Sequence, residues 1–277
     1  MVTTHSELRE TLAEADRSRA ARVALVPTMG ALHRGHASLL DEARRMADLV
    51  VASIFVNPLQ FGAGEDLARY PRSLEADLAM CQQHGVSVVF APSVDVVYPA
   101  WPPVVTVDPG PTGSILEGAS RPEHFRGVLT VVAKLFGLVT PNVAIFGEKD
   151  YQQLVLVRQL ATDLCMPVEV VGAETVRGLD GLALSSRNRY LSDSERACAL
   201  ALSRALAAGA AAGSGGATGV LAAAEAVLGS EPGVAVDYLT LRGTDFGEPP
   251  NAGEARLLVA AKVGGTRLID NLAVQLS

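Results

Sequence analysis

The chain has 277 residues, of which 49% are apolar and 19% charged, and its 30 acidic and 23 basic side chains give a net charge of −7. This length allows one large domain or two smaller ones with a sizeable core, while the negative charge and an aromatic content of only 5% argue against nucleic-acid binding. The three cysteines are widely spaced and form no CxxC pair, which is typical of a reducing compartment.

The N-terminal segment has none of the features of a targeting sequence. Residues 1–19 contain acidic side chains and no apolar run, unlike a secretory signal or an Arg-rich transit peptide. No stretch reaches the roughly 18 uninterrupted apolar residues of a membrane span; the run 128–139 is short and is interrupted by Lys134. We therefore expect a cytoplasmic protein that does not associate with a membrane.

From residue 22 onward, short β-branched runs alternate with helical patterns. This alternation predicts an α/β fold, a Rossmann-like parallel sheet with flanking helices. Some of the runs are almost continuously apolar, as expected for strands that are buried on both faces. The predicted strands are 22–28, 48–56, 86–92, 142–147 and 168–171, and the predicted helices are 36–47, 73–84, 127–139 and 151–164.

The pattern changes near residue 176. A loop rich in Gly, Ser and Arg leads into an Ala-rich stretch over residues 195–229, which we interpret as two short helices around a Gly-rich turn. Ser192 and Glu195 have the S-x-x-E spacing of a helix start, in which the hydroxyl and the carboxylate satisfy each other's neighbouring backbone donors.

Two further strands are predicted after the Ala-rich stretch, at 234–242 and 255–263. Helices followed by sequential strands are typical of a small α+β domain. We therefore predict two domains, a Rossmann-like domain over residues 1–176 and a smaller C-terminal α+β lid domain over residues 177–277.

Three polar clusters directly follow predicted strands. In an open parallel sheet the ligand crevice lies beyond the carboxyl ends of the strands, so these clusters should share one edge. The first, TMGALHRGH, contains Gly30 and Gly35, which allow close backbone approach, and a helix start whose amides would attract an anion. His33 and His36 would share one face of the helix. The alternatives are two exposed histidines or a zinc pair, and the latter lacks an HExxH glutamate.

The second cluster, NPLQFG, follows the second strand. Asn57 and Pro58 are typical of a simple strand exit, because the residue before proline is held extended. Gln60 lies between Leu59 and Phe61, and an amide in an apolar wall needs a polar partner. The cluster is therefore either a strand exit or part of a site that binds a small polar substrate.

The third cluster, GEKDYQQ, follows the strand at 142–147. Lys149 could neutralise a phosphate, and Asp150 could accept from ribose hydroxyls or cap the next helix. Gln153 lies one turn from Asp150 on the same helix face. The alternative is the charged start of a surface helix.

The fourth cluster, LSSRNRY, lies in the loop after residue 176 and offers two hydroxyls and two guanidinium groups. It is either a solvated basic loop or a movable clamp on a polyphosphate. No GxxxxGK[ST] motif occurs, so any ATP site in this chain is not a P-loop.

Together these residues resemble the pantothenate synthetase family, the AMP-forming pantoate:β-alanine ligases. The resemblance rests on motifs that occur in the family's order, and it extends to the C-terminal VDYLTLR, RLLVAAKVG and TRLIDN. More distantly, HxGH is similar to the signature of the nucleotidylyltransferase superfamily. The motifs are PTMGALHRGH, SIFVNPLQFG, YPR at 70–72, FGEKDYQQL and LSSRNRYL.

The resemblance implies a two-step reaction with ATP and Mg²⁺ and no tightly bound organic cofactor. Pantoate attacks the α-phosphorus of ATP and releases pyrophosphate, and β-alanine then attacks the pantoyl adenylate and releases AMP. Such chemistry requires positioning and charge neutralisation more than covalent help. The family also implies small-molecule partners only and a homodimer.

The resemblance likewise assigns site residues. Among them, His36, His33 and Lys149 would be catalytic, with His36 as the proton donor. Pantoate would bind Gln60 and Gln153, and Gln60 would also lie beside β-alanine. The ATP-binding residues would be Met29, Gly30, Ala31, Leu32, His33, Arg34, Gly35 and His36; Gly147, Glu148, Lys149 and Asp150; Val176; and Leu184, Ser185, Ser186 and Arg187.

No metal ligand is assigned from the sequence. Asp77 is a possible Mg²⁺ ligand, but most ligands of Mg²⁺ in ATP sites are phosphate oxygens and waters. By the same resemblance, Glu117, Arg121 and Arg126 would shape the pocket wall.

Three other functions compete with a ligase. A related adenylyltransferase with a phosphate acceptor would need basic residues where Gln60 and Gln153 stand. A synthetase-like RNA binder is disfavoured by the negative charge. A non-catalytic nucleotide-binding regulator is the third alternative, although no catalytic residue is evidently missing among the His, Lys, Ser and Arg residues of the motifs.

Overall fold

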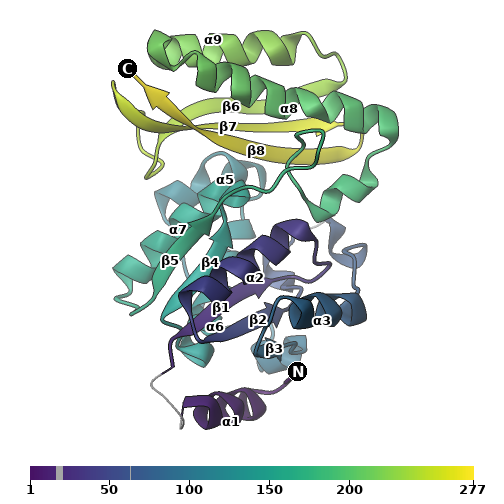
Figure 1. Ribbon diagram of the computed structural model, residues 1–277, viewed down its shortest axis with the longest axis vertical. Coiled ribbons are helices and arrows are strands. Elements are labelled where there is room, and N and C mark those ends of the chain that lie inside the picture. Colours follow the sequence, from purple (N-terminus) through teal and green to yellow (C-terminus); the bar gives the residue numbers. More distant parts are fainter. Residues whose placement is uncertain (17–20, 63) are drawn as a thin grey trace. The chain divides into compact units, whose positions relative to one another are not determined.

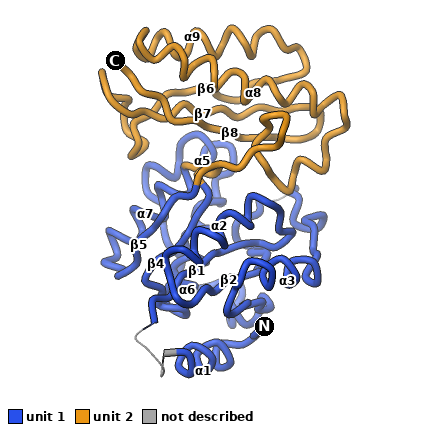
Figure 2. The backbone as a smooth tube through the Cα atoms, in the orientation of Figure 1, with its two compact units in different colours: residues 1–147, 152–173 blue, residues 148–151, 174–277 orange. Residues whose placement is uncertain are grey.

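The computed structural model describes residues 1–16, 21–62 and 64–277. Contacts within the chain group its residues into two compact units (Figure 2). Unit 1 contains residues 1–147 and 152–173, and unit 2 contains residues 148–151 and 174–277. The sequence prediction placed a single boundary after residue 176, whereas the contacts divide the chain after Ala173 and also assign the four residues 148–151 to unit 2.

Unit 1 is built on a parallel five-stranded sheet with the strand order β3-β2-β1-β4-β5 (Figure 1). The Rossmann-like fold class is therefore confirmed. Since β2, β1 and β4 are parallel neighbours, their carboxyl ends lie at one edge of the sheet. The strands are β1 Val23–Thr28, β2 Leu49–Ile54, β3 Val88–Phe90, β4 Val143–Gly147 and β5 Glu169–Ala173.

Helices cover the sheet of unit 1. The apolar side of α2 packs with Cys81 of α3 on β1, β2 and β4, and the largely buried α6 contacts β1. Strands that are covered on both faces have continuous apolar sequences. In β1, accordingly, the consecutive residues Ala24, Leu25 and Val26 are all fully buried. The helices are α1 His5–Asp16, α2 Arg34–Met46, α3 Leu74–Gln83, α4 Val94–Val97, α5 Glu117–Ser120, α6 His124–Val139 and α7 Tyr151–Asp163.

Unit 2 consists of an antiparallel three-stranded sheet, β6-β7-β8, with two helices packed on it. The predicted helix start is confirmed, because Ser192 and Glu195 form a reciprocal capping box at the N-terminus of α8. The third strand, β8, was not predicted from the sequence. The elements are α8 Asp193–Ala211, α9 Gly216–Gly229, β6 Val234–Gly243, β7 Gly253–Val263 and β8 Thr266–Leu276.

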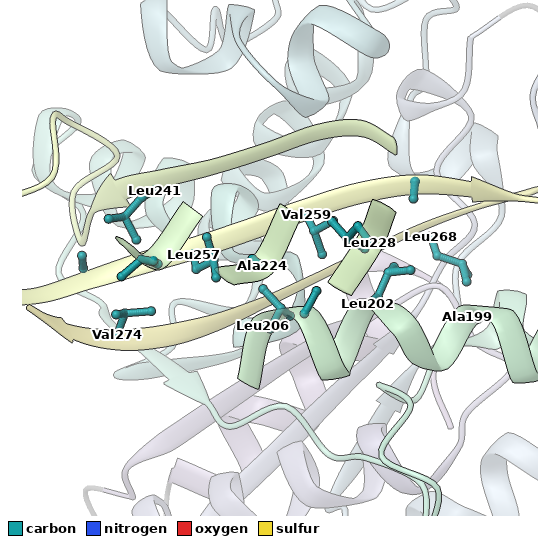
Figure 3. Packing of buried hydrophobic residues seen from close by; sticks show 14 of the residues in the cluster. Ala199, Leu202, Leu206, Ala224, Leu228, Leu241, Leu257, Val259, Leu268 and Val274 are labelled. Atoms are coloured by element: carbon teal, nitrogen blue, oxygen red, sulfur yellow. The ribbon is translucent and has the colours of Figure 1, made fainter. Parts of the chain in front are cut away.

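The core of unit 2 explains the Ala-rich composition of its helices. Ala199, Ala205 and Ala224 are fully buried, so small side chains let α8 and α9 approach the sheet closely. Leu202 and Leu206 then interlock with Leu257 and Val259 of β7 (Figure 3). Among the described residues, no single helix is long and apolar enough to cross a membrane; α8 and α9 meet that test only as a pair, and they are bent by 62°.

Candidate functional site

The segment after β1 is held in a strained conformation by a buried carboxylate. Gly30 and Ala31 have positive φ values of 81° and 52°, the second of which is uncommon for a residue with a Cβ. Asp77 of α3 accepts hydrogen bonds from the backbone N–H of Ala31 at 2.9 Å and of Leu32 at 2.8 Å. Asp77 is only 2% exposed. Its carboxylate therefore fixes the path of the chain that leads to the two histidines.

His33 and His36 form a close pair at the N-terminus of α2, with their ring planes tilted by 44°. Their ring centroids are 4.2 Å apart. Nδ1 of His33 accepts from the backbone N–H of Gly35, and Nδ1 of His36 accepts from the backbone N–H of His33. Because an accepting ring nitrogen carries no proton, the neutral rings must hold their protons on Nε2. Both imidazoles are thus oriented as Nε2–H donors.

The sequence analysis predicted that the backbone amides at the start of α2 would attract an anion, but in the structure these amides have partners within the same turn. The backbone N–H groups of Gly35, His36 and Ala37 all donate to His33, through its ring or its carbonyl oxygen. These three amides are satisfied locally, so an anion at this helix start would be bound by side chains, among which the two rings carry Nε2–H donors. Among the described residues, no group of three or more His, Cys, Asp or Glu side chains could hold a metal ion.

Gln60 follows β2 and is held by a chain of buried hydrogen bonds. Tyr98 donates its hydroxyl to Oδ1 of Asn57 at 2.9 Å, and Nδ2 of Asn57 donates to Oε1 of Gln60 at 3.2 Å. Burial raises the pKa of the Tyr98 phenol, so this hydroxyl remains a donor near neutral pH. The order of donors orients the Gln60 amide so that Nε2 is directed away from Asn57, where it donates to Sδ of Met29 at 3.0 Å. Gln60 can therefore donate to an oxygen of a ligand.

The main chain at Gln60 is fixed from the other side by residues near the start of α6. Arg121 and His124 both contact the carbonyl oxygen of Gln60, at 3.2 and 2.9 Å. Arg121 also forms an ion pair with Glu65. Burial alone would raise the pKa of the Glu65 carboxyl, but the hydrogen bonds and charge of Arg121 outweigh it and hold this pKa below its ordinary value. Arg121 thus stabilises the Gln60 segment.

The other residues predicted near the pocket wall have different surroundings. The backbone N–H of Glu117 donates to Oε1 of Gln152, whose Nε2 donates to two backbone carbonyls. The Gln152 amide is therefore used within the fold, whereas its neighbour Gln153 is only half-buried. Arg126 is 46% exposed and lies 3.7 Å from Glu123 and 4.0 Å from Asp108, which is the geometry of weak surface ion pairs.

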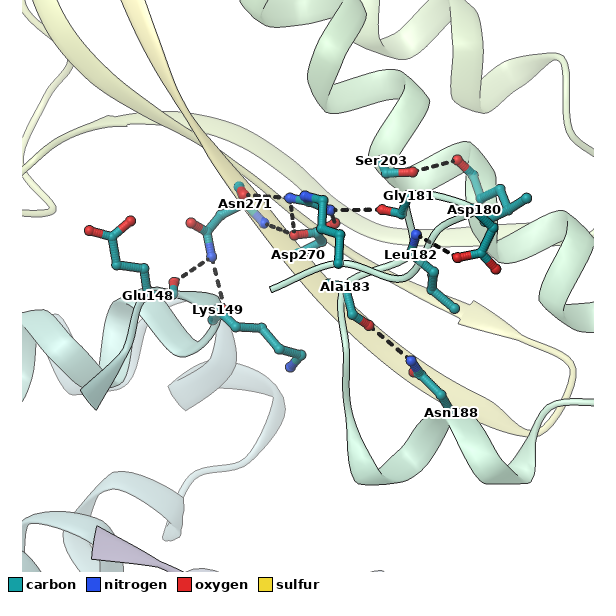
Figure 4. A network of polar contacts seen from close by, with 12 residues as sticks. Glu148, Lys149, Asp180, Gly181, Leu182, Ala183, Asn188, Ser203, Asp270 and Asn271 are labelled. Carbon is teal, nitrogen blue, oxygen red and sulfur yellow. Dashed lines mark hydrogen bonds and ion pairs between the residues drawn. The ribbon is translucent and has the colours of Figure 1, made fainter. Parts of the chain in front are cut away.

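In unit 2, residues 148–151 are anchored by β7 and β8. Asn271 donates from Nδ2 to the backbone carbonyls of Glu148 and Lys149, at 2.9 Å each (Figure 4). Arg256 forms an ion pair with Glu148 at 2.7 Å and lies 4.1 Å from the ring centre of Tyr151. Nζ of Lys149 lies 3.5 Å from Oδ1 of Asp150. The predicted cationic segment after β4 is therefore held by the C-terminal sheet.

The Ser-Arg segment also lies in unit 2, at the end of a short hairpin. The backbone N–H of Leu184 donates to the carbonyl of Val176 at 2.9 Å. Oγ of Ser185 accepts from the N–H of Arg187 and caps the 3-10 helix Ser186–Tyr190. The side chain of Asn188 donates to the carbonyl of Ala183 (Figure 4). Ser185, Ser186 and Arg187 are half-buried in this ordered turn.

The structure thus brings predicted residues together within each unit. In unit 1 the His33–His36 pair shares one turn and Met29 contacts Gln60. The sequence analysis missed several residues that hold these groups: Asn57 as an orienting amide, Tyr98, Arg256, Asp270 and Asn271. The sequence pattern that could have pointed to these residues is a polar residue within an apolar strand, as in RLIDN. This pattern does not reveal which group is the hydrogen-bond partner.

Comparisons with known proteins agree with these observations. The family described as Pantoate-beta-alanine ligase matches residues 1–273. Pantothenate synthetases of a Nocardioides species and of Nocardia farcinica are each 60% identical to this chain, over 99% and 96% of its length and 84% and 83% of theirs.

Solved structures are similar over the same length. The crystal structure of pantothenate synthetase from Thermus thermophilus has a TM-score of 0.91 and 50% identity, with 98% of both chains covered. The pantoate-beta-alanine ligase of Francisella tularensis, complexed with Beta-gamma ATP and Beta-alanine, has a TM-score of 0.79 and 32% identity, with 98% of this chain and 96% of that one covered. The chain therefore belongs to the pantoate–β-alanine ligase family, the pantothenate synthetases.

Proposed function

We propose that this protein condenses pantoate with β-alanine, using ATP and releasing AMP and pyrophosphate, through a pantoyl adenylate. Membership of the family over residues 1–273 supports the reaction class. The observation that carries the proposal is the His33–His36 pair, whose Nδ1 atoms both accept backbone hydrogen bonds and whose Nε2–H groups are thereby made donors. Two such donors suit phosphate oxygens.

In the first step, a carboxylate oxygen of pantoate attacks the α-phosphorus of ATP and the bond to the pyrophosphate oxygen breaks. We propose that His33 and His36 donate hydrogen bonds from Nε2–H to the phosphates. His36, the proton donor that the family resemblance implies, would act on the leaving pyrophosphate as a hydrogen-bond donor, because a neutral ring whose Nδ1 accepts a backbone N–H has no proton to transfer. Lys149 would counter the negative charge on the α-phosphate. The chain's contribution is therefore orientation and charge neutralisation.

We propose that Gln60 and Gln153 bind pantoate. Gln60 is suited to this because its Oε1 is already bonded to Asn57, which leaves Nε2 to donate to a carboxylate or hydroxyl oxygen. The same donor, lying beside β-alanine, would help to hold the acyl group while the amine attacks the carbonyl carbon and AMP leaves.

The remaining ATP contacts are also part of the proposal. Met29 to Leu32, Arg34 and Gly35 would line the nucleotide site, together with Gly147, Glu148, Asp150 and Val176. Leu184, Ser185, Ser186 and Arg187 would bind the triphosphate. Mg²⁺ would bind mainly through phosphate oxygens and waters. We further propose a cytoplasmic homodimer with no organic cofactor.

The test is the exchange of labelled pyrophosphate into ATP. Mg-ATP with pantoate should support exchange in the absence of β-alanine, and AMP should accumulate only after β-alanine is added. An adenylyltransferase with a phosphate acceptor would show no exchange with pantoate, and absence of exchange across the neutral pH range would refute the proposal.

Variants then test the residue roles. We expect His36→Ala and Lys149→Ala to lower the exchange rate by ~10²-fold or more, the scale on which one transition-state contact acts. His84→Ala and Lys262→Ala are matched controls, because His84 pairs with Asp41 on the surface and Lys262 is exposed on β7. Rates within a few-fold of the controls would contradict the assigned roles.

A further inference from the structure

The main chain that carries Lys149 is fixed by a single buried amide. Asn271 of β8 is 3% exposed, and its Nδ2 donates to the carbonyl oxygens of both Glu148 and Lys149 at 2.9 Å (Figure 4). Two consecutive carbonyls held by one amide group leave this segment little freedom to rotate. The position of the Lys149 Cα is therefore set by a residue 122 positions further along the chain.

The orientation of the Asn271 amide is itself determined. Its Oδ1 accepts from Nε of Arg256 at 2.7 Å, and an amide flip would place two donors together. Arg256 is 5% exposed, and its Nη2 contacts the carboxylate of Glu148 at 2.7 Å. Arg256 also lies over the ring of Tyr151. The amide and the guanidinium together hold residues 148–151 as one unit with β7 and β8.

The neighbouring residue on β8 holds the other cationic segment. Asp270 is 3% exposed and accepts both arms of the Arg177 guanidinium, at 2.6 and 3.0 Å. Arg177 follows Val176 and pairs across the hairpin with Ala183, which directly precedes Leu184. The Asp270 carboxylate also accepts from the backbone N–H of Asn271 at 2.8 Å. One contiguous hydrogen-bond network thus connects residues 148–149 to the hairpin that leads into Ser185–Arg187.

We propose that the Asp270–Asn271 pair is a positioning element for the reaction: Asn271 places Lys149, and Asp270 places the start of the Ser185–Arg187 segment through Arg177. The proposal rests on the role of Lys149 given above. Both cationic segments then keep a fixed geometry relative to each other, as parts of unit 2. These residues act through others and touch no substrate.

The physical reason is the sensitivity of catalysis to position. A displacement of about 1 Å in a catalytic group can cost on the order of 10²-fold in rate. Removing the Asn271 side chain beyond Cβ leaves the two carbonyls without this donor and lets the Lys149 backbone shift. The defect should fall on the turnover of the adenylation step, because no contact with pantoate is lost.

The test is a double-mutant cycle on the pyrophosphate exchange rate. Asn271→Ala should lower kcat for exchange ~10-fold or more, with the KM for pantoate within about two-fold of wild type. In a Lys149→Ala background the same substitution should cost less than about two-fold, since there is no ammonium left to position. An equal loss in both backgrounds would overturn the proposal. If Lys149→Ala alone retained activity, the assigned role of Lys149 would fail instead, which is a distinguishable result.

Control variants separate positioning from general destabilisation. Asp237→Asn weakens an ion pair with Arg267 in the same unit and should leave exchange unchanged. Asn271→Ser keeps one donor on a shorter side chain, so it should lose less activity than Asn271→Ala and serves as the test variant if the latter does not fold. Equal losses in Asn271→Ser and Asp237→Asn would show that unit 2 is merely destabilised, and would also overturn the proposal.

Discussion

Asp77 offers a decisive test of how the segment after β1 is held. Its carboxylate is 2% exposed and accepts the backbone N–H groups of Ala31 and Leu32 at 2.9 and 2.8 Å, and it also accepts the hydroxyl of Ser73 at 3.2 Å. A Cβ added at Gly30 would lie only 2.9 Å from Oδ2 of Asp77, so the loop and the carboxylate are closely packed. Replacing Asp77 with Ala should therefore affect stability and activity together.

The magnitude follows from the donors that are left unpaired. A buried backbone donor without a partner costs about 1–3 kcal/mol, and Ala31 and Leu32 contribute two. Because Leu32 is only half-buried, water can reach its amide, and we expect a total loss of about 2–4 kcal/mol in the free energy of unfolding. Asp77→Asn keeps one accepting oxygen but turns an NH₂ group towards the other amide, so its loss should be roughly half as large.

The assay is urea unfolding followed by the fluorescence of Trp101, which is the only tryptophan in the sequence and lies in unit 1. Glu75→Ala is the matched control, because Glu75 is an exposed acid in the same first turn of α3 and its loss removes only a helix-dipole interaction. The KM for ATP should rise in Asp77→Ala as residues 30–32 loosen.

A different outcome would refute this reasoning. If Asp77 were instead a Mg²⁺ ligand, Asp77→Ala would raise the Mg²⁺ concentration needed for half-maximal exchange and leave the unfolding midpoint close to that of Glu75→Ala. That pattern would mean that the two backbone hydrogen bonds contribute little and that Asp77 acts on the metal.

Two further predictions concern the segment around Gln60. A Cβ at Gly127 of α6 would lie 2.4 Å from the carbonyl of Leu59 and 2.5 Å from the nitrogen of Gln60, so Gly127→Ala should cost about 1–3 kcal/mol of stability and raise the KM for pantoate more than that for ATP. Gly137→Ala in the same helix meets nothing within 4 Å and is the control; equal kinetics in the two variants would contradict the prediction. The pKa of Glu65 is lower in the folded protein than its ordinary value of 4.5. The pair with Arg121 should therefore stabilise the fold fully above pH 4.5, and this stabilisation should be lost as the pH falls through the folded-state pKa. The free energy of unfolding of Glu65→Gln, measured against pH, should lack this decline, and an unchanged acid profile would show that the pair does not contribute.

The features that were predictable from the sequence are those with a local physical cause. Alternating β-branched and helical patterns indicated the parallel sheet, because period and strand length are set by neighbouring residues. The Ser192–Glu195 spacing indicated the start of α8 because a capping box involves only four consecutive residues. The position of HRGH, NPLQ and GEKD after strands also followed from chain order and the rule that ligands bind at the carboxyl ends.

Other features required partners far apart in the chain. Asp77 lies 46 residues from Ala31, and Asn271 lies 122 residues from Lys149, and no periodicity relates such pairs. The strand β8 was missed because Asp270 and Asn271 interrupt its apolar alternation, and only the tertiary structure shows that their buried polar groups are satisfied.

The sequence by itself determined which residue types stand at the ends of the strands, and hence the class of chemistry. The tertiary structure decided how they are oriented: the Nδ1 acceptors that place protons on Nε2 of His33 and His36, the Asn57 donor that turns the Gln60 amide, and the assignment of residues 148–151 to unit 2. The physical reason is that the direction of a hydrogen bond depends on which donor faces which acceptor, and that pairing exists only once distant segments have packed together.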